Sequence, residues 1–399
     1  MRMRNSVGSM IRGKATLLAR LTERTKMFKT AQVGEQLEGA SPTIFVGRYG
    51  YPKVFIGPML PDLHGDTRYM DTPEDWLGTV STPEDVVSFR LQLVRGKQAV
   101  HIKDTSRITE MVKEIALSTK STEVEAQFVH RPTGGTFNEE VQPFGPSAAL
   151  KSMRVEPGKY DHQLEKAYYD TDLKAADAVK ELYERGAAVS SIQRAFSVGA
   201  FGIEQNRKLV PTRWSITAVD STLGEYLLKR VREYPNIEDY RVYEYEHLRN
   251  KFVVLMIPQR WSYESMEAFF PSIIGDKLEI FGDWEGYEKK TEYSIIGGCF
   301  YSVKMSAAEL LEKEKKQATV IVLREAYSGY VPLGVWNCRE CMREALKESP
   351  KRFDTLKATI NYAGSRLKIP MATWIKETNL LRDILKRGLQ SSLNAWLYS

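Results

Sequence analysis

The amino-acid sequence predicts an α+β fold, in which strands and helices are mixed without strict β-α-β alternation. Two observations lead to this prediction. Short apolar runs of strand length recur along the chain, and segments of helical periodicity separate them at irregular intervals. The chain has 399 residues, of which 42% are hydrophobic and 27% charged. That composition is typical of a globular protein, and the length exceeds the usual size of a single core. We therefore expect two domains or one elaborated domain.

The first half of the chain is predicted to begin with a helix and to continue with short strands. Apolar residues at helical spacing among lysines and arginines indicate an amphipathic basic helix from about Ser9 to Lys29. Two strands, 44–46 and 53–56, flank a turn at 47–52 that is rich in glycine. Thr72-Pro73 and Thr82-Pro83 each precede two acidic residues, a pattern typical of helix starts. The other elements expected here are strands at 99–102 and 124–129, a loop at 131–147, and helices at 106–117, 160–185 (ended by Gly186) and 189–196.

Strands are predicted to dominate the second half, with helices interspersed among them. The predicted strands are 214–219, 241–246, 252–257, 278–282, 300–305 and 319–323. The predicted helices are about 223–231, 307–316, 339–347 and 373–387. Gly388 interrupts the last helix and is expected to act as a flexible hinge before the final residues.

The charge balance is mildly basic and excludes few classes of function. There are 57 lysines and arginines against 51 aspartates and glutamates, which gives a net charge of +6. Such a balance is compatible with DNA contact but is not diagnostic of it. The chain has no apolar run long enough to cross a bilayer, and no apolar core follows its basic start. We therefore expect a cytoplasmic protein that does not associate with membranes.

Cysteine usage indicates neither a disulfide framework nor a metal centre. The three cysteines are Cys299, Cys338 and Cys341, and the last two form a lone C-x-x-C. A tetrahedral zinc site needs four ligands, and no second pair or closely spaced histidine pair completes this one. We expect free, buried or half-buried thiols, no metal and no cofactor.

Two short segments combine cations with aromatic residues. The turn at 47–53 carries two tyrosines between Arg48 and Lys53, and the segment 207–214 carries Lys208 and Arg213 before a tryptophan, at the start of the predicted strand 214–219. Cations bind phosphates and aromatic faces stack on bases, so these four cations are candidate nucleic-acid-binding residues. A strand edge protected by charge explains the second segment equally well.

Common catalytic motifs are absent from the sequence, which has no phosphate-binding glycine loop, no nucleophile elbow and no H-E-x-x-H. Asp283 and Glu285, with lysines close behind them, follow an apolar run. Two carboxylates at a strand end can bind a divalent metal ion and support phosphodiester hydrolysis. A solvent-exposed turn flanked by Gly282 and Gly286 is the favoured interpretation, and a metal-dependent nuclease is the alternative.

The last ten residues match the PIP box, the peptide that docks on PCNA-type sliding clamps. Gln390, Leu393, Trp396 and Leu397 have its spacing. Leu393, Trp396 and Leu397 stand at i, i+3 and i+4, so one helical turn places all three on one side as an apolar plug. Gln390 adds an amide that both donates and accepts hydrogen bonds. A tail that packs on its own domain is the other interpretation.

Over nearly its whole length the chain resembles the archaeal Nre family of DNA repair proteins. The segments that carry the resemblance are 47–54, 93–97, 208–217, 282–286 and the PIP-like ending. The resemblance implies participation in DNA damage repair, binding to the PCNA clamp, an archaeal and cytoplasmic setting, and a larger N-terminal region (1–290) followed by a smaller C-terminal one (291–387) and a tail (388–399).

Two departures from the family pattern limit what the resemblance implies. Some Nre-like proteins begin with a four-cysteine zinc motif, whereas no cysteine precedes Cys299 here. The PIP-like ending has Trp396-Leu397 where two aromatic residues are usual, which implies a lower affinity. The family supplies no catalytic residues, so the leading hypothesis is a repair protein brought to DNA by the clamp, and a DNA-processing enzyme is the alternative.

Overall fold

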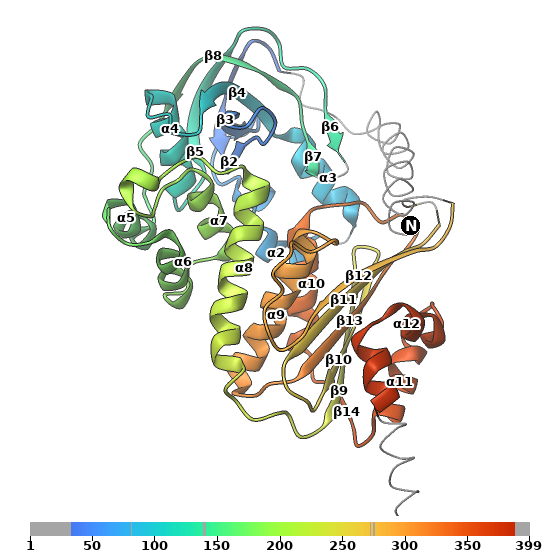
Figure 1. The fold of residues 1–399 in the computed structure, drawn as a ribbon. Coiled ribbons are helices and arrows are strands. Elements are labelled where there is room, and N and C mark those ends of the chain that lie inside the picture. Colours follow the sequence, from blue (N-terminus) through green and yellow to red (C-terminus); the bar gives the residue numbers. More distant parts are fainter. Residues whose placement is uncertain (1–32, 81, 139–140, 272, 274–275, 388–399) are drawn as a thin grey trace, which may run out of the picture. The chain divides into compact units, whose positions relative to one another are not determined.

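The computed structural model describes residues 33–80, 82–138, 141–271, 273 and 276–387 of the chain (Figure 1). Its contacts separate these residues into two compact units. Of the described residues, the N-terminal unit comprises 33–223 together with Pro332–Trp336, and the C-terminal unit comprises Gly224–Val331 and 337–387. Each unit contains a six-stranded sheet with helices, so the α+β prediction is confirmed. The predicted helix at 9–29 and the PIP-like tail lie outside the described residues.

The sheet of the N-terminal unit has the strand order β1-β5-β8-β4-β3-β2. Its strands are β1 (Gln36–Ser41), β2 (Thr43–Val46), β3 (Lys53–Leu60), β4 (Val94–His101), β5 (Thr122–Phe128) and β8 (Ser147–Val155). Only β4 and β8 pair in parallel, and the other neighbours are antiparallel. A separate hairpin joins β6 (Thr136–Asn138) and β7 (Val141–Phe144). The strands β2 and β3 are confirmed, whereas β1 and β8 were not predicted.

The helices of this unit are α2 (Pro73–Thr79), α3 (Pro83–Gln92), α4 (Arg107–Leu117), α5 (His162–Tyr169), α6 (Ala175–Glu184) and α7 (Val189–Ser197), with short 3-10 turns at Arg68–Met70 and Glu204–Asn206. Both predicted Thr-Pro helix starts are confirmed, and Thr82 and Asp85 form a capping box. The single helix predicted at 160–185 is wrong, because Asp170 accepts hydrogen bonds from the N–H groups of Asp172 and Leu173 and turns the chain after α5.

The sheet of the C-terminal unit has the strand order β12-β11-β13-β10-β9-β14. Its strands are β9 (Tyr240–His247), β10 (Asn250–Ile257), β11 (Ser262–Phe269), β12 (Glu279–Glu285), β13 (Thr319–Ala326) and β14 (Lys351–Phe353). Only β11 and β13 pair in parallel. Every residue of β10 and β13 is buried, which requires that both faces of the sheet be covered.

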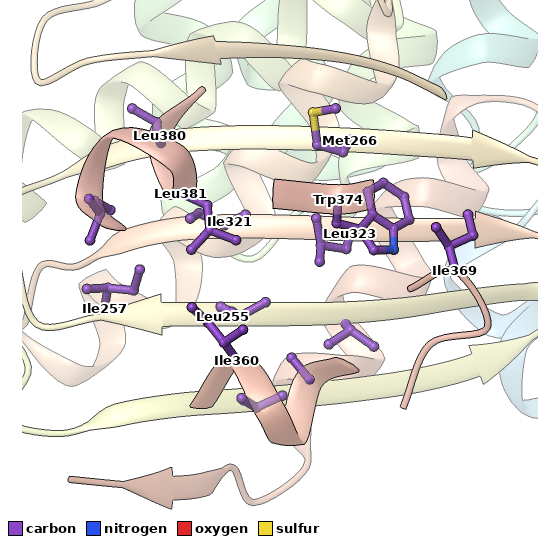
Figure 2. Close-up of a cluster of buried hydrophobic side chains, with 14 of the residues drawn as sticks. Leu255, Ile257, Met266, Ile321, Leu323, Ile360, Ile369, Trp374, Leu380 and Leu381 are labelled. Carbon is purple, nitrogen blue, oxygen red and sulfur yellow. The ribbon is translucent and has the colours of Figure 1, made fainter. Parts of the chain in front are cut away.

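Helices cover both faces of this second sheet (Figure 1). The helices α9 (Gly298–Glu314) and α10 (Val335–Lys347) lie on one face, and α11 (Leu356–Ser365), α12 (Met371–Glu377) and the helical residues 380–387 lie on the other. Figure 2 shows the apolar layer beneath α11 and α12, where Trp374 packs beside Leu323 and Met266. Side chains at even positions of β11 point toward α11 and α12, and those at odd positions point toward α9 and α10.

Two predicted strands are helical. The segment 300–305 belongs to α9, and 214–219 belongs to α8 (Thr212–Val231), within which the division between the two units falls. Both segments are rich in β-branched or aromatic residues, which favour strands in isolation. Burial overrides that preference, because Phe300, Val303, Ala307 and Leu311 are buried at helical spacing. None of the described helices is long and apolar enough to cross a membrane.

Candidate nucleic-acid interface

The turn between β2 and β3 holds aromatic side chains in solvent. Gly50 has φ +85°, and its carbonyl accepts a hydrogen bond from the N–H of Lys53, which closes the turn at 2.9 Å. The N–H of Gly47 donates to the carbonyl of Phe55 at 2.7 Å. Tyr49 and Tyr51 are 64% and 42% exposed, and Phe55, just inside β3, also reaches solvent. Large aromatic residues exposed this close together usually mark a binding surface.

Backbone hydrogen bonds fasten the start of α8 beside this turn. The N–H of Leu209 donates to the carbonyl of Ile102, and the N–H of Ile102 donates to the carbonyl of Pro52. The hydroxyl of Thr212, the first residue of α8, accepts a hydrogen bond from the N–H of Val46 at 2.9 Å. The segment 207–214 therefore leads into a helix rather than a strand, and the interpretation of this segment as a charged strand edge is wrong.

The two cation–aromatic segments meet in the folded unit. The rings of Tyr51 and Trp214 lie with their centroids 5.2 Å apart and are tilted by 54°. Trp214 is 44% exposed, so the pair forms an open aromatic platform rather than part of the core. We call the exposed residues around this pair the aromatic–basic surface; they are Tyr49, Tyr51, Lys53, Phe55, His101, Lys103, Lys208 and Trp214.

The four candidate cations differ in how they contribute to this surface. Lys53 and Lys208 are exposed, whereas Arg213 is half-buried. Arg48 lies over the ring of Tyr49 at 5.0 Å and donates to its hydroxyl, which holds the aromatic side chain in place. Lys53 stands opposite His101 on β4, and Lys103 follows two residues later.

Two charged residues close to this surface are engaged within the protein. Arg207 donates hydrogen bonds to the carbonyls of Gly202 and Tyr168 at 2.7 Å, and burial lowers its pKa. Asp104 accepts hydrogen bonds from the hydroxyls of Ser106 and Thr109 at the start of α4. Burial alone would raise the pKa of Asp104, but these hydrogen bonds lower it below its usual value. The carboxylate therefore serves the helix start and leaves the neighbouring lysines available to an anionic partner.

Asp283 and Glu285 lie inside β12, and the interpretation of this segment as a solvent-exposed turn is wrong. Both side chains are buried, and they lie on the face of the sheet covered by α9, from which Lys304 contacts Glu285. Asp283 accepts hydrogen bonds from Lys290 at 3.0 Å and from the N–H of Ile295 at 3.1 Å. Glu285 accepts one at 3.0 Å from Lys304, a fully buried lysine.

This arrangement gives the two carboxylates an internal role. Lys304 is also bound to Glu225 at 2.6 Å, so one ammonium bridges two carboxylates. Among the described residues, neither Asp283 nor Glu285 belongs to a group of side chains spaced for a metal ion. An ammonium takes the place that a divalent cation would need in a nuclease site.

Sequence reasoning missed two features of the structure. Phe55 lies within the strand predicted at 53–56, and its alternation with the buried Val54 and Ile56 shows that its side chain points outward. The second feature is a cluster in which Cys338 contacts Cys299 instead of Cys341, its neighbour in the C-x-x-C. Cys299 and Cys338 are far apart in sequence, so spacing rules gave no signal.

The fold and the surface define the chain as a two-unit α+β protein with an exposed platform of aromatic residues and cations. Two models of a known protein family match this chain. The family model described as Archaeal Nre, N-terminal, matches residues 11–274, and the model described as Archaeal Nre, C-terminal, matches residues 285–396. The chain belongs to the archaeal Nre family, and its larger N-terminal part is confirmed. The boundary predicted near residue 290 stays a prediction.

Three relatives are similar to the chain over most of their length. The DNA repair protein NreB of Archaeoglobus fulgidus is 39% identical over 363 residues, which cover 90% of each chain. The DNA repair protein NreA of the same organism is 33% identical over 87% of this chain and 90% of its own. The DNA repair protein NreA of Haloferax volcanii is 30% identical over 93% and 91%. No solved structure matches the chain.

Proposed function

We propose that this protein acts in DNA repair and contacts DNA through the aromatic–basic surface. The names of its relatives support the repair role, since three proteins similar over most of their length are called DNA repair proteins. The observation that carries the DNA contact is the pairing of Tyr51 with Trp214 beside exposed lysines. Bases stack on exposed aromatic faces, and lysines neutralise phosphates on either side of them.

The composition of this surface favours recognition without sequence preference. Every base has an aromatic face, and lysines act on phosphates as point charges. Stacking needs unpaired bases, so single-stranded or branched DNA is the preferred partner of a Tyr51–Trp214 platform. A duplex offers only its phosphates to the same surface and is expected to bind more weakly.

DNA binding is expected to fall steeply with salt, because released counterions supply much of the free energy. Lys53→Ala or Lys208→Ala should each reduce the slope of log affinity against log salt by about 0.7 on single-stranded DNA. Fluorescence anisotropy with a labelled oligonucleotide at several salt concentrations measures this slope.

The matched control is Lys120→Ala, which removes an exposed lysine from the loop before β5. Its slope should stay at the wild-type value. An equal reduction in all three variants would mean that net charge, rather than this surface, governs binding. Failure to bind single-stranded, duplex or branched DNA at low salt would end the proposal.

We further propose that the C-terminal segment binds a PCNA-type clamp. The support is the spacing of Gln390, Leu393, Trp396 and Leu397 in the sequence. A few buried anchors dominate such interfaces. A peptide covering residues 383–399 should bind with micromolar affinity, on the order of −8 kcal/mol.

The residue dependence of clamp binding follows from the plug geometry. Leu393→Ala and Trp396→Ala should each cost about 2 kcal/mol or more, whereas Ser391→Ala should cost little. Gln390→Ala should fall between these, because it removes hydrogen bonds but little apolar area. Calorimetry with a clamp of the archaeal type measures all four. Undiminished binding by the full-length chain after deletion of residues 390–399 would contradict the proposal.

A further inference from the structure

A buried cluster in the C-terminal unit brings together two thiols and a carboxylate from three separate elements. Glu267 comes from β11, Cys299 from the first turn of α9 and Cys338 from α10. Cys338 Sγ lies 3.1 Å from Cys299 Sγ and 3.9 Å from Glu267 Oε1. One ligand atom from each residue lies within 4.8 Å of the other two. Such a spacing suits three ligands of one metal ion.

The distances fit a tetrahedral zinc ion after a small adjustment. With Zn–S bonds of about 2.3 Å and a Zn–O bond of about 2.0 Å, tetrahedral angles place two sulfurs about 3.8 Å apart and a sulfur and an oxygen about 3.5 Å apart. The observed separations of 3.1 and 3.9 Å differ from these by less than 1 Å. Small rotations of the cysteine and glutamate side chains cover such differences.

Hydrogen bonds from a buried arginine orient the carboxylate. Arg324 Nη1 donates to Glu267 Oε1 at 2.5 Å, and Arg324 Nη2 lies 2.8 Å from the hydroxyl of Tyr330. The side-chain carbonyl of Asn250 accepts from Arg324 Nε at 3.0 Å. Outer hydrogen bonds of this kind fix the direction of metal-ligating carboxylates in proteins.

The charges of the cluster favour an exchange of protons for a dication. Without metal, the carboxylate of Glu267 and the guanidinium of Arg324 form an ion pair, and the free cysteines Cys299 and Cys338 lie beside them. Zinc binding displaces one proton from each of Cys299 and Cys338. The two charges lost with these protons equal the two charges that Zn²⁺ brings. The buried site therefore takes up the ion without a net change in charge, which removes the main cost of placing a dication in the protein interior.

From this geometry we infer a zinc site whose ligands are Cys299 Sγ, Cys338 Sγ and a Glu267 carboxylate oxygen. Two thiolates with one oxygen ligand in tetrahedral arrangement select zinc over magnesium or calcium. We assign the fourth position to a water molecule; Cys299 is half-buried, whereas Glu267 and Cys338 are buried. Cys341 takes no part, because its thiol donates to the side-chain carbonyl of Asn337 at 3.2 Å.

Cobalt titration of the full-length protein tests this site. Protein purified under reducing conditions and freed of metal with a chelator should bind one equivalent of Co²⁺ and show the thiolate-to-cobalt charge-transfer band of a sulfur-bound ion. Zinc should displace the cobalt, and about two protons should be released per zinc bound in weakly buffered solution. Cys299→Ser and Cys338→Ser should lose the charge-transfer band, and Glu267→Gln should weaken cobalt binding. The matched control Cys341→Ser should keep the band and the cobalt affinity of the wild-type protein.

Several results would overturn the assignment. One is a wild-type protein that binds no cobalt or zinc with defined stoichiometry. A second is a charge-transfer band that survives in Cys299→Ser, whose half-buried position makes it the variant least prone to misfold. The third is a disulfide between Cys299 and Cys338. It would appear as one free thiol instead of three when freshly purified, unreduced protein is denatured and its thiols are titrated with a thiol-reactive dye. Circular dichroism of each variant separates loss of the site from loss of the fold.

Discussion

Replacing Lys304 with methionine is expected to destabilise the protein by about 3–5 kcal/mol. Lys304 is fully buried and bridges Glu225 and Glu285, and the side chain of Glu285 has no exposure to solvent. Removal of the ammonium leaves a buried carboxylate uncompensated, which costs far more than the loss of an exposed ion pair. Methionine keeps most of the aliphatic volume, so the effect reports charge rather than a cavity. Urea denaturation followed by tryptophan fluorescence measures the change.

Two further variants separate charge from packing. Lys315→Ala removes an exposed lysine from the end of the same helix and should change stability little. Adding Glu285→Gln to Lys304→Met should recover part of the loss, because the two groups are coupled. A nuclease that uses Asp283 and Glu285 would behave differently. Glu285→Gln would then remain fully stable and lose metal-dependent DNA cleavage, and this result would restore the catalytic interpretation.

Trp214→Ala and Tyr51→Ala are expected to weaken single-stranded DNA binding by about 1–3 kcal/mol each, or about 5- to 150-fold. The two rings form one exposed platform, so each provides area on which a base can stack. Their combined effect should be less than the sum, because residues in contact do not act independently. Trp214→Phe should retain part of the affinity, since a smaller ring still stacks.

The chain supplies a matched control for this prediction. Trp284 is exposed to nearly the same extent as Trp214, at 43% against 44%, and lies on β12 of the C-terminal unit. Trp284→Ala should leave DNA binding unchanged. Equal losses from Trp284→Ala and Trp214→Ala would show that exposed tryptophan in general, rather than the aromatic–basic surface, determines the affinity.

Local sequence signals identified much of the fold. The apolar runs at β9, β10 and β13 and the helices α4 and α7 were predicted close to their observed bounds, because their patterns agree with their final burial. The strand β11 was missed, since buried glutamates at 264 and 267 break the apolar pattern expected of a central strand. Glu264 is satisfied there by N–H groups of Asn379 and Leu380, more than a hundred residues away. No local rule anticipates such a partner.

For the candidate sites, too, the sequence predicts the segments involved but not which of their residues meet in the fold. Sequence composition selected the segments around Arg48 and Lys208, but only the fold shows that Tyr51 and Trp214 meet. Arg207 looked equivalent to Lys208 in the sequence, yet its guanidinium is engaged by backbone carbonyls. Asp283 and Glu285 resemble a metal site in the sequence, because nothing there shows that Lys304, predicted in a different strand, is the counter-ion of Glu285 in the fold.

Photo-crosslinking offers the most direct measurement of the central claim, that DNA lies on the aromatic–basic surface. A single-stranded oligonucleotide containing 5-iodouracil is irradiated in complex with the full-length protein, and the linked residues are located by mass spectrometry. The proposal predicts links to Tyr51 and Trp214, with Tyr49 and Phe55 as the nearest alternatives. Links confined to other parts of the chain, with these four aromatic residues unmodified, would contradict the account.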